Sequence, residues 1–101
     1  MAWPVLIWSP LALDRASEIV DYISLDNPSA AKRWVDTIFE KVEQLIPSPE
    51  MGRIGPEISD SLFREIIYGN YRIIYHLEPA TISILTIRHG KQILPIDEIK
   101  A

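Results

Sequence analysis

The sequence predicts an α+β domain in which a strand, an antiparallel two-helix hairpin and a three-stranded antiparallel sheet follow one another (β-αα-βββ), with a short C-terminal tail. Two helix starts, at Ser9-Pro10 and Asn27-Pro28, combine a capping side chain with a proline suited to the first helical turn. A Gly69-Asn70 pair between two β-rich runs indicates a tight hairpin. The 101 residues suffice for one hydrophobic core, so we expect residues 1–101 to form a single domain.

The first strand and the first helix occupy the N-terminal quarter of the chain. Val5–Trp8 is a short apolar run of the kind that forms a strand. The helix begins at Ser9-Pro10 and extends to about Asp26, because Asn27-Pro28 disfavours its continuation. Its apolar positions recur at spacings of three and four and form one stripe, which comprises Ala12, Ala16, Ile19, Val20 and Ile23.

The second helix begins at Asn27-Pro28 and is stopped by Pro47 and Pro49. Almost nothing separates it from the first helix, so the two should form an antiparallel hairpin. Its apolar stripe comprises Ala31, Trp34, Val35, Ile38, Val42 and Leu45. Neither stripe is stable in water, and we expect both to pack on the sheet that follows.

Three strands are expected after a loop at residues 51–61, at Leu62–Tyr68, Tyr71–Leu77 and Thr81–Arg88. A two-residue loop at Gly69-Asn70 and a three-residue loop at Glu78–Ala80 fix which side chains share a face. One face then carries Phe63, Glu65, Ile67, Arg72, Ile74, His76, Ile82, Ile84, Thr86 and Arg88. The other face carries Arg64, Ile66, Tyr68, Tyr71, Ile73, Tyr75, Leu85, Ile87 and His89, and it is assigned to the helices because its centre is more apolar.

Composition excludes several classes of protein. There is no cysteine, so neither a disulfide framework nor a thiolate metal site is available. Pro4 and Pro10 interrupt the only apolar N-terminal run, so we predict no signal peptide, no membrane span and a cytoplasmic location. No Gly-rich phosphate loop, zinc-ligand spacing or nucleophile elbow occurs, and neither a cofactor nor a metal is expected.

The charge distribution divides the chain. The net charge of −4 argues against non-specific binding of nucleic acid. Residues 62–92, however, hold four basic and two acidic side chains together with both histidines. The C-terminal half therefore carries a modest positive field on an acidic molecule.

The arginines inside the predicted hairpin are the main candidates for function. Arg72 either pairs with Glu65 across the hairpin or acts as an anion clamp for phosphate. Arg64 is expected to be structural and paired with an acid on a helix. Glu57, Arg72 and His89 together would provide a base, a phosphate clamp and an acid, which suffice for RNA cleavage without a metal.

Several short motifs in order resemble the RelE/ParE superfamily of bacterial toxins over nearly the whole chain. These are Trp8-Ser9-Pro10, Asn27-Pro28-Ser29-Ala30-Ala31, Gly52-Arg53, Phe63-Arg64-Glu65, Asn70-Tyr71-Arg72-Ile73-Ile74-Tyr75 and Ile87-Arg88-His89-Gly90-Lys91. The resemblance implies the toxin of a type II toxin–antitoxin module of the plasmid-stabilisation type, held inactive by a cognate antitoxin. RelE-like members cut messenger RNA in the ribosomal A site, and ParE-like members poison DNA gyrase.

The resemblance favours the ParE-like activity. Of the RelE catalytic positions, only the arginine after the hairpin turn is kept, as Arg72. Two basic positions fall on Phe63 and Glu65, a late arginine falls near Gln92, and no tyrosine follows Tyr75. A related subgroup uses a Glu-Arg-His set, which Glu57, Arg72 and His89 match loosely.

Three functions stay open at this point: inhibition of DNA gyrase, ribosome-dependent cleavage of mRNA, and a binding module that has lost its toxicity. The partners implied are an antitoxin with an acidic extended tail, and either gyrase or the ribosome with its mRNA. We expect the chain to form a hetero-oligomer with the antitoxin or a dimer through its exposed apolar surface. The residues expected to form the binding surface are Arg53, Arg64, Glu65, Arg88 and Lys91.

Overall fold

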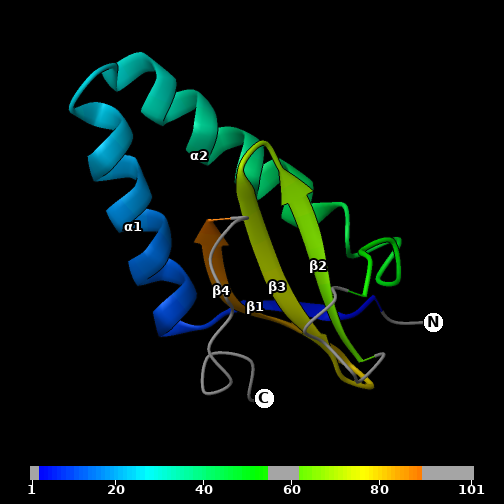
Figure 1. Cartoon of the computed structure of the whole chain (residues 1–101). Helices are drawn as coiled ribbons and strands as arrows, with labels where there is room; N and C mark the ends of the chain where they lie inside the picture. The colour runs from blue at the N-terminus through cyan, green and yellow to red at the C-terminus, as the bar shows by residue number, and fades with distance from the viewer. Residues whose placement is uncertain (1–2, 55–61, 90–101) are drawn as a thin grey trace.

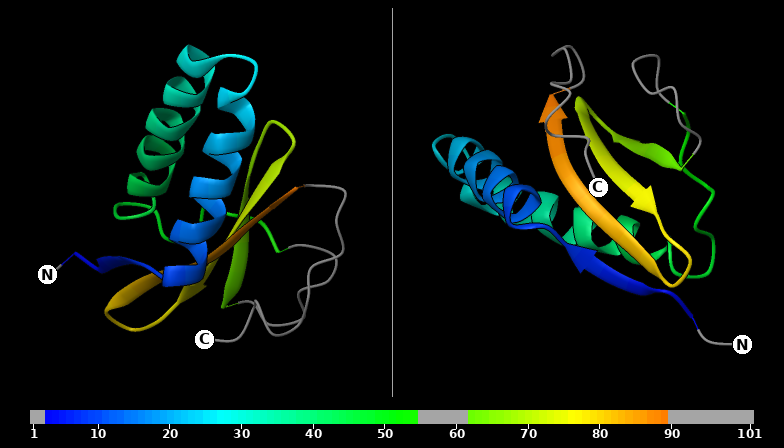
Figure 2. Two further views of the ribbon diagram at one scale, coloured as in Figure 1. Left: turned by 90° about the vertical axis from the view of Figure 1, so that its left-hand side faces the viewer. Right: turned by 90° about the horizontal axis from the view of Figure 1, so that it is seen from below.

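The computed structural model describes residues 3–54 and 62–89, which form a four-stranded sheet with two helices on one face (Figures 1 and 2). The elements in order are β1 (Val5–Trp8), α1 (Pro10–Ser24), α2 (Pro28–Glu43), β2 (Phe63–Tyr68), β3 (Tyr71–Leu77) and β4 (Thr81–His89). This order confirms the predicted β-αα-βββ arrangement. Among these residues, no helix is both long and apolar enough to cross a bilayer.

The N-terminal strand extends the predicted three-stranded sheet to four strands. The strand order is β1-β4-β3-β2, and β1 runs parallel to β4 while the other neighbours are antiparallel. Val5 pairs with Thr81 and Trp8 with Ile84, so the first and last strands of the described chain lie side by side. A parallel pair requires a long connection, and here the helical hairpin and two strands supply it.

Both helices begin at the predicted caps. The Ser9 Oγ accepts a hydrogen bond from the Ala12 N–H at 3.0 Å and donates one to the Leu85 carbonyl at 2.8 Å. The Asn27 Oδ1 accepts from the Ala30 N–H at 3.1 Å. Each cap satisfies one of the backbone donors that a helix start leaves open. Ser9 also fixes α1 to β4.

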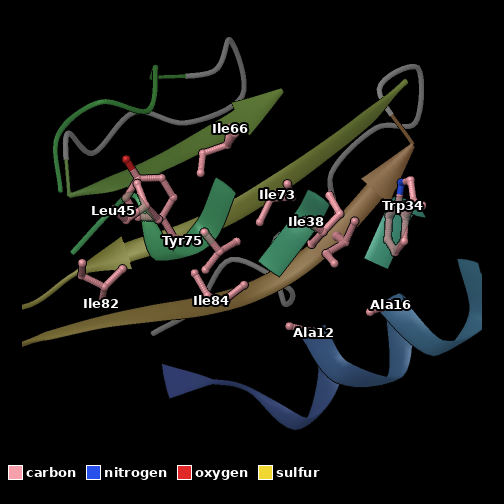
Figure 3. Packing of buried hydrophobic residues seen from close by; sticks show 12 residues of the cluster. Ala12, Ala16, Trp34, Ile38, Leu45, Ile66, Ile73, Tyr75, Ile82 and Ile84 are labelled. Atoms are coloured by element: carbon pink, nitrogen blue, oxygen red, sulfur yellow. The ribbon is translucent and has the colours of Figure 1, made fainter. Parts of the chain in front are cut away.

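The core lies between the helices and the sheet (Figure 3). The helices contribute Ala12, Ala16, Trp34, Ile38 and Val42, and the connection after α2 contributes Leu45. The sheet contributes Ile66, Ile73, Tyr75, Ile82, Ile84 and Ile87. Small alanines on α1 allow that helix to approach the sheet closely, and the predicted helical stripes supply the rest of the apolar surface.

The turn between β2 and β3 is the predicted two-residue loop. Tyr68 pairs with Tyr71, and Gly69 has φ +57°, a conformation that costs little without a Cβ. The resulting register puts Arg72 and Glu65 on the face that the helices leave uncovered, as expected.

The loop between β3 and β4 is shorter than the three residues predicted. The backbone of Glu78 donates to Thr81 at 2.9 Å, so Pro79-Ala80 forms the tip and Leu77 pairs with Ile82. The register then shifts between Ile74 and Tyr75, so that Leu85 is bulged out of the ladder.

Three face assignments from the sequence are consequently wrong. Ile82 and Ile84 lie in the core under the helices, whereas Leu85 packs with Ile74 on the opposite face. The shorter turn inverts the facing of β4 relative to the prediction, and the bulge restores the predicted facing. Thr86 therefore pairs with Ile74, and the predicted facing of the end of β4 is restored.

Candidate functional site

A buried ion pair occupies the helix-free face of the sheet at the centre of the arginine-rich hairpin. The Nη2 of Arg72 lies 2.6 Å from Oε1 of Glu65, and its Nε lies 3.2 and 3.3 Å from the two carboxylate oxygens. The side chains are 4 % and 0 % exposed. Of the two alternatives for Arg72, the cross-hairpin pair with Glu65 is the contact observed.

A second arginine shares the same carboxylate. The Nη2 and Nε of Arg53 each lie 3.1 Å from Oε2 of Glu65, while 62 % of the Arg53 side chain is exposed. The backbones of the two residues also exchange hydrogen bonds of 2.9 and 2.8 Å, so residue 53 forms an isolated bridge on β2. We name Arg53, Glu65 and Arg72 the carboxylate cluster. With two guanidinium groups and one carboxylate, it has a formal charge of +1 and exposes that charge at Arg53.

The chain before Arg53 is held by a buried tyrosine. The Oη of Tyr75 accepts from the Gly52 N–H at 2.9 Å and donates to the Pro49 carbonyl at 2.9 Å. A Cβ on Gly52 would meet the Tyr75 hydroxyl and come within 2.8 Å of the Glu65 carbonyl oxygen, so the close approach requires glycine. Burial raises the pKa of Tyr75 above 10.0, although the Gly52 N–H opposes that shift.

Arg64 fixes the same segment from the helix side of β2. Its Nη1 donates to the carbonyls of Glu50 and Gly52, each at 3.1 Å. The sequence predicts an acid on a helix as its partner, whereas these bonds go to backbone carbonyls between α2 and β2. Arg64 and Tyr75 thus position the backbone from which Arg53 extends.

The end of β4 brings Arg88 and His89 beside α1. Arg88 pairs with Arg72 in the ladder, and His89 pairs with Tyr71, with ring centroids 5.9 Å apart. A cavity of about 260 Å³ there is lined by Arg15, Glu18, Ile19, Tyr71, Ile87, Arg88 and His89. In the strand pleat, Arg72 and His89 point to opposite faces of the sheet.

Two predicted site residues, Glu57 and Lys91, lie outside the described residues. Within residues 3–54 and 62–89, no three His, Cys, Asp or Glu side chains converge as metal ligands would. Of the three residues predicted to act as base, phosphate clamp and acid, the described part of the chain therefore contains Arg72 and His89.

An apolar cavity and the role of Tyr75 were not predictable from the sequence. The cavity, of about 700 Å³, lies between the α2–β2 connection and the β3–β4 turn and is lined by Ser48, Pro49, Glu50, Met51, Leu62, Leu77, Glu78 and Pro79. No local pattern could reveal it, because its walls come from three separate segments. The Gly52-Arg53 dipeptide was a usable signal, since a glycine before an arginine in a loop permits close backbone approach.

The fold is a small α+β domain with a basic cluster on its helix-free face, and comparison with known proteins gives its family. Residues 6–94 match the family described as "ParE toxin of type II toxin-antitoxin system, parDE". The chain therefore belongs to the ParE toxin family, within the RelE/ParE superfamily of type II toxins.

Individual relatives agree with this assignment. Protein Y4kP of Sinorhizobium fredii (strain NBRC 101917 / NGR234), which is named as a candidate toxin, is 37 % identical over 90 residues, covering 87 % of this chain and 90 % of that protein. A solved chain of the chromosomal ParDE toxin–antitoxin system from P. aeruginosa has a TM-score of 0.72 at 23 % identity. That match covers 88 % of this chain and 98 % of the solved chain, and it supports the fold.

Proposed function

We propose that this ParE-family toxin arrests growth by inhibiting DNA gyrase in the cytoplasm, and that a cognate antitoxin encoded beside it neutralises it. A module of this kind would stabilise the plasmid or other replicon that carries it. The family match supports the toxin class. The observation that favours gyrase over RNA is the state of Arg72, whose guanidinium is occupied by Glu65 and is 4 % exposed.

Cleavage of RNA by the predicted set would need Arg72 to reach a phosphate and His89 to reach the same substrate. A buried guanidinium that already has a carboxylate partner would have to leave Glu65 with only the exposed Arg53 beside it, which costs several kcal/mol. The opposite facing of Arg72 and His89 adds to this difficulty. We therefore favour an activity based on binding, without catalysis by Glu57, Arg72 and His89.

We propose that the antitoxin contacts the exposed part of the carboxylate cluster. Arg53 presents a guanidinium on a rigid backbone, held by Glu65 and by the contacts of Arg64. Arg88, which pairs with Arg72 in the ladder, is proposed to extend this basic surface, and Lys91 is proposed to contribute to antitoxin binding. An extended antitoxin tail rich in acids would complement such a surface.

Two assays run side by side test the target. Purified gyrase should lose supercoiling activity on addition of the full-length chain and regain it when the antitoxin is added. Ribosomes translating a defined mRNA should show no new cleavage with the same preparation. Translation-dependent cleavage with unaffected gyrase would instead establish the RelE-like activity, and Arg72→Ala should then abolish the cutting.

A charge-reversal pair tests the antitoxin surface. Arg53→Glu should weaken antitoxin binding at least about tenfold, because it puts a negative charge where an acidic tail is expected to bind. Lys32→Glu is the matched control, since Lys32 is 82 % exposed on α2 and distant from the cluster in sequence. If calorimetric titration showed equal effects of the two variants on antitoxin affinity, Arg53 would not be part of the antitoxin-binding surface.

An expression test addresses the remaining alternative, an inactive relative kept as a binding module. Induction of the chain alone in a bacterial host should arrest growth, and co-expression with the product of the adjacent reading frame should restore it. Normal growth with confirmed expression of folded protein would show that the toxicity has been lost.

A further inference from the structure

The two edges of the sheet are protected to different degrees. On the β2 edge, Arg53 exchanges two backbone hydrogen bonds with Glu65, and charged side chains occupy the strand. On the other edge is β1, and within the described part of the chain no strand lies beyond it (Figure 2). Edge strands usually carry lysines, prolines or bulges that prevent association with other strands.

The β1 edge carries no charge to deter a partner. The chain from Trp3 to Leu13 contains no charged residue, although the protein has a net charge of −4. Three large apolar side chains are exposed there, with Trp3 at 69 %, Val5 at 59 % and Ile7 at 49 %. Exposed apolar residues on an uncharged edge favour pairing with another strand.

The backbone of β1 has hydrogen-bonding groups available in a defined pattern. The N–H groups of Val5 and Ser9 donate to the carbonyls of Ala80 and Ile84, each at 2.9 Å. Because alternate residues of a strand point to opposite edges, the N–H and C=O groups of Leu6 and Trp8 point away from β4. These four groups form the outer rim of the sheet.

We propose that β1 pairs antiparallel with β1 of a second copy of this chain, about a twofold axis through Ile7. In this register Leu6 faces Trp8 of the second copy, and the two pairs make four backbone hydrogen bonds. Ile7 faces its own counterpart on the helix-free side, where apolar cross-strand pairs stabilise a ladder. The two four-stranded sheets then become one sheet of eight strands.

The prolines that flank the strand fit this register. Pro4 and Pro10 lie at equal distances from Ile7, and each lacks an N–H. Pro4 precedes β1 and Pro10 is the first residue of α1, so the ladder ends before each of them, and neither position has an N–H to leave without an acceptor. A ladder shifted by two residues would instead put Pro4 opposite an outward-facing residue and lose a bond.

A second copy suits this edge better than an acidic peptide does. An acidic strand would find no cation between Trp3 and Leu13, whereas the uncharged β1 meets an identical uncharged strand. The interface is small, because a four-residue strand buries less than the roughly 1,200 Å² of a stable complex. The dimer is therefore weak and its formation depends on concentration.

Sedimentation velocity of the full chain, without antitoxin, tests the proposal. Between about 5 and about 500 µM the weight-average mass should rise toward that of a dimer. Over the same range, hydrogen exchange at the Leu6 and Trp8 amides should slow, while exchange at Val5 and Ile7 should not depend on concentration. A chain that remains monomeric throughout, or uniform exchange at all four amides, overturns the proposal.

Charge variants at the twofold axis test the register. Ile7→Lys and Ile7→Glu should each weaken dimerisation at least about tenfold through like-charge repulsion, and an equimolar mixture should restore a heterodimer. Leu13→Lys is the control, because Leu13 is similarly exposed (47 %) but lies on α1. Loss of the dimer in the control, or failure of the folded Ile7 variants to recover when mixed, contradicts the register.

Discussion

The two faces of the sheet are both buried near their centres, but by different physical means. On the helix-covered face, burial is apolar, and Ile38, Ile73 and Ile84 are each at most 1 % exposed. On the helix-free face, Glu65 and Arg72 are buried to a similar degree but carry full charges, and they share this face with the buried apolar pair Ile74 and Leu85. An apolar core loses stability when volume is removed, whereas a buried ion pair loses stability when one charge remains without the other.

The largest effect is expected from breaking the ion pair. Arg72→Met should lower the free energy of unfolding by about 3–5 kcal/mol, because it leaves Glu65 buried with only the exposed Arg53 beside it. The double variant Arg72→Met/Glu65→Leu should recover most of this loss, since apolar residues of similar volume require no charge compensation. Urea denaturation of the four proteins of the cycle measures both quantities. A double variant no more stable than Arg72→Met would mean that the face is not tolerant of apolar replacement.

A similar but simpler loss is expected on the helix-covered face. Ile38→Ala removes a side chain that is 1 % exposed and should cost about 2–5 kcal/mol through lost burial and the cavity left behind. Ile38→Val, with one methyl group fewer, should cost about 0.5–1.5 kcal/mol. Denaturant unfolding of Ile38→Val and Ile38→Ala should show a loss of stability that grows with the volume removed. Breaking the ion pair, in contrast, should give one large loss. Equal losses from the two substitutions would contradict a packing origin.

A smaller effect should follow from removing the buried hydroxyl of Tyr75. Tyr75→Phe removes hydrogen bonds to Gly52 and Pro49 and should cost about 1–3 kcal/mol at pH 8. Because burial raises the pKa of Tyr75 above 10.0, the folded chain keeps the phenol protonated while the unfolded chain ionises. The wild-type advantage should therefore be constant below about pH 9 and shrink as pH rises through 10. Denaturation midpoints of both proteins across this range test the sign, and an advantage that grows with pH would contradict it.

The smallest effect is expected at the exposed arginine of the carboxylate cluster. Arg53→Gln should change the free energy of unfolding by less than about 1 kcal/mol, because the side chain is 62 % exposed and its charge is screened by water. The backbone bridge to Glu65 is kept in this variant. A loss as large as that from Arg72→Met would show that the two guanidinium groups stabilise the carboxylate equally.

Local features of the fold were predictable because short-range chemistry determines them. Ser9 and Asn27 cap the two helices as expected, and Gly69 adopts the positive φ of the hairpin turn. The facing of Arg72 follows from that turn alone. Each of these depends on a few consecutive residues, which a single sequence displays.

Features that depend on distant segments were not predictable in the same way. The bulge at Leu85 lies in β4, which is paired with β3 on one side and β1 on the other, and no nearby glycine signals it. The contact of Gly52 with Tyr75 joins residues 23 positions apart. At the candidate site, the pairing of Arg72 with Glu65 was one of two alternatives that the sequence predicted. The sequence did not indicate that Arg53 binds the same carboxylate.

The parallel pairing of β1 with β4 has a consequence for synthesis of the chain. Ser9 and Leu85, whose hydrogen bond fixes the start of α1, are 76 residues apart in sequence. Contacts of such high sequence separation slow folding and cannot form until the later residue has left the ribosome. The sheet and the α1–β4 contact are therefore completed only after β4 has been translated. Chains released before Thr81 lack the strand that β1 requires and cannot reach the native fold.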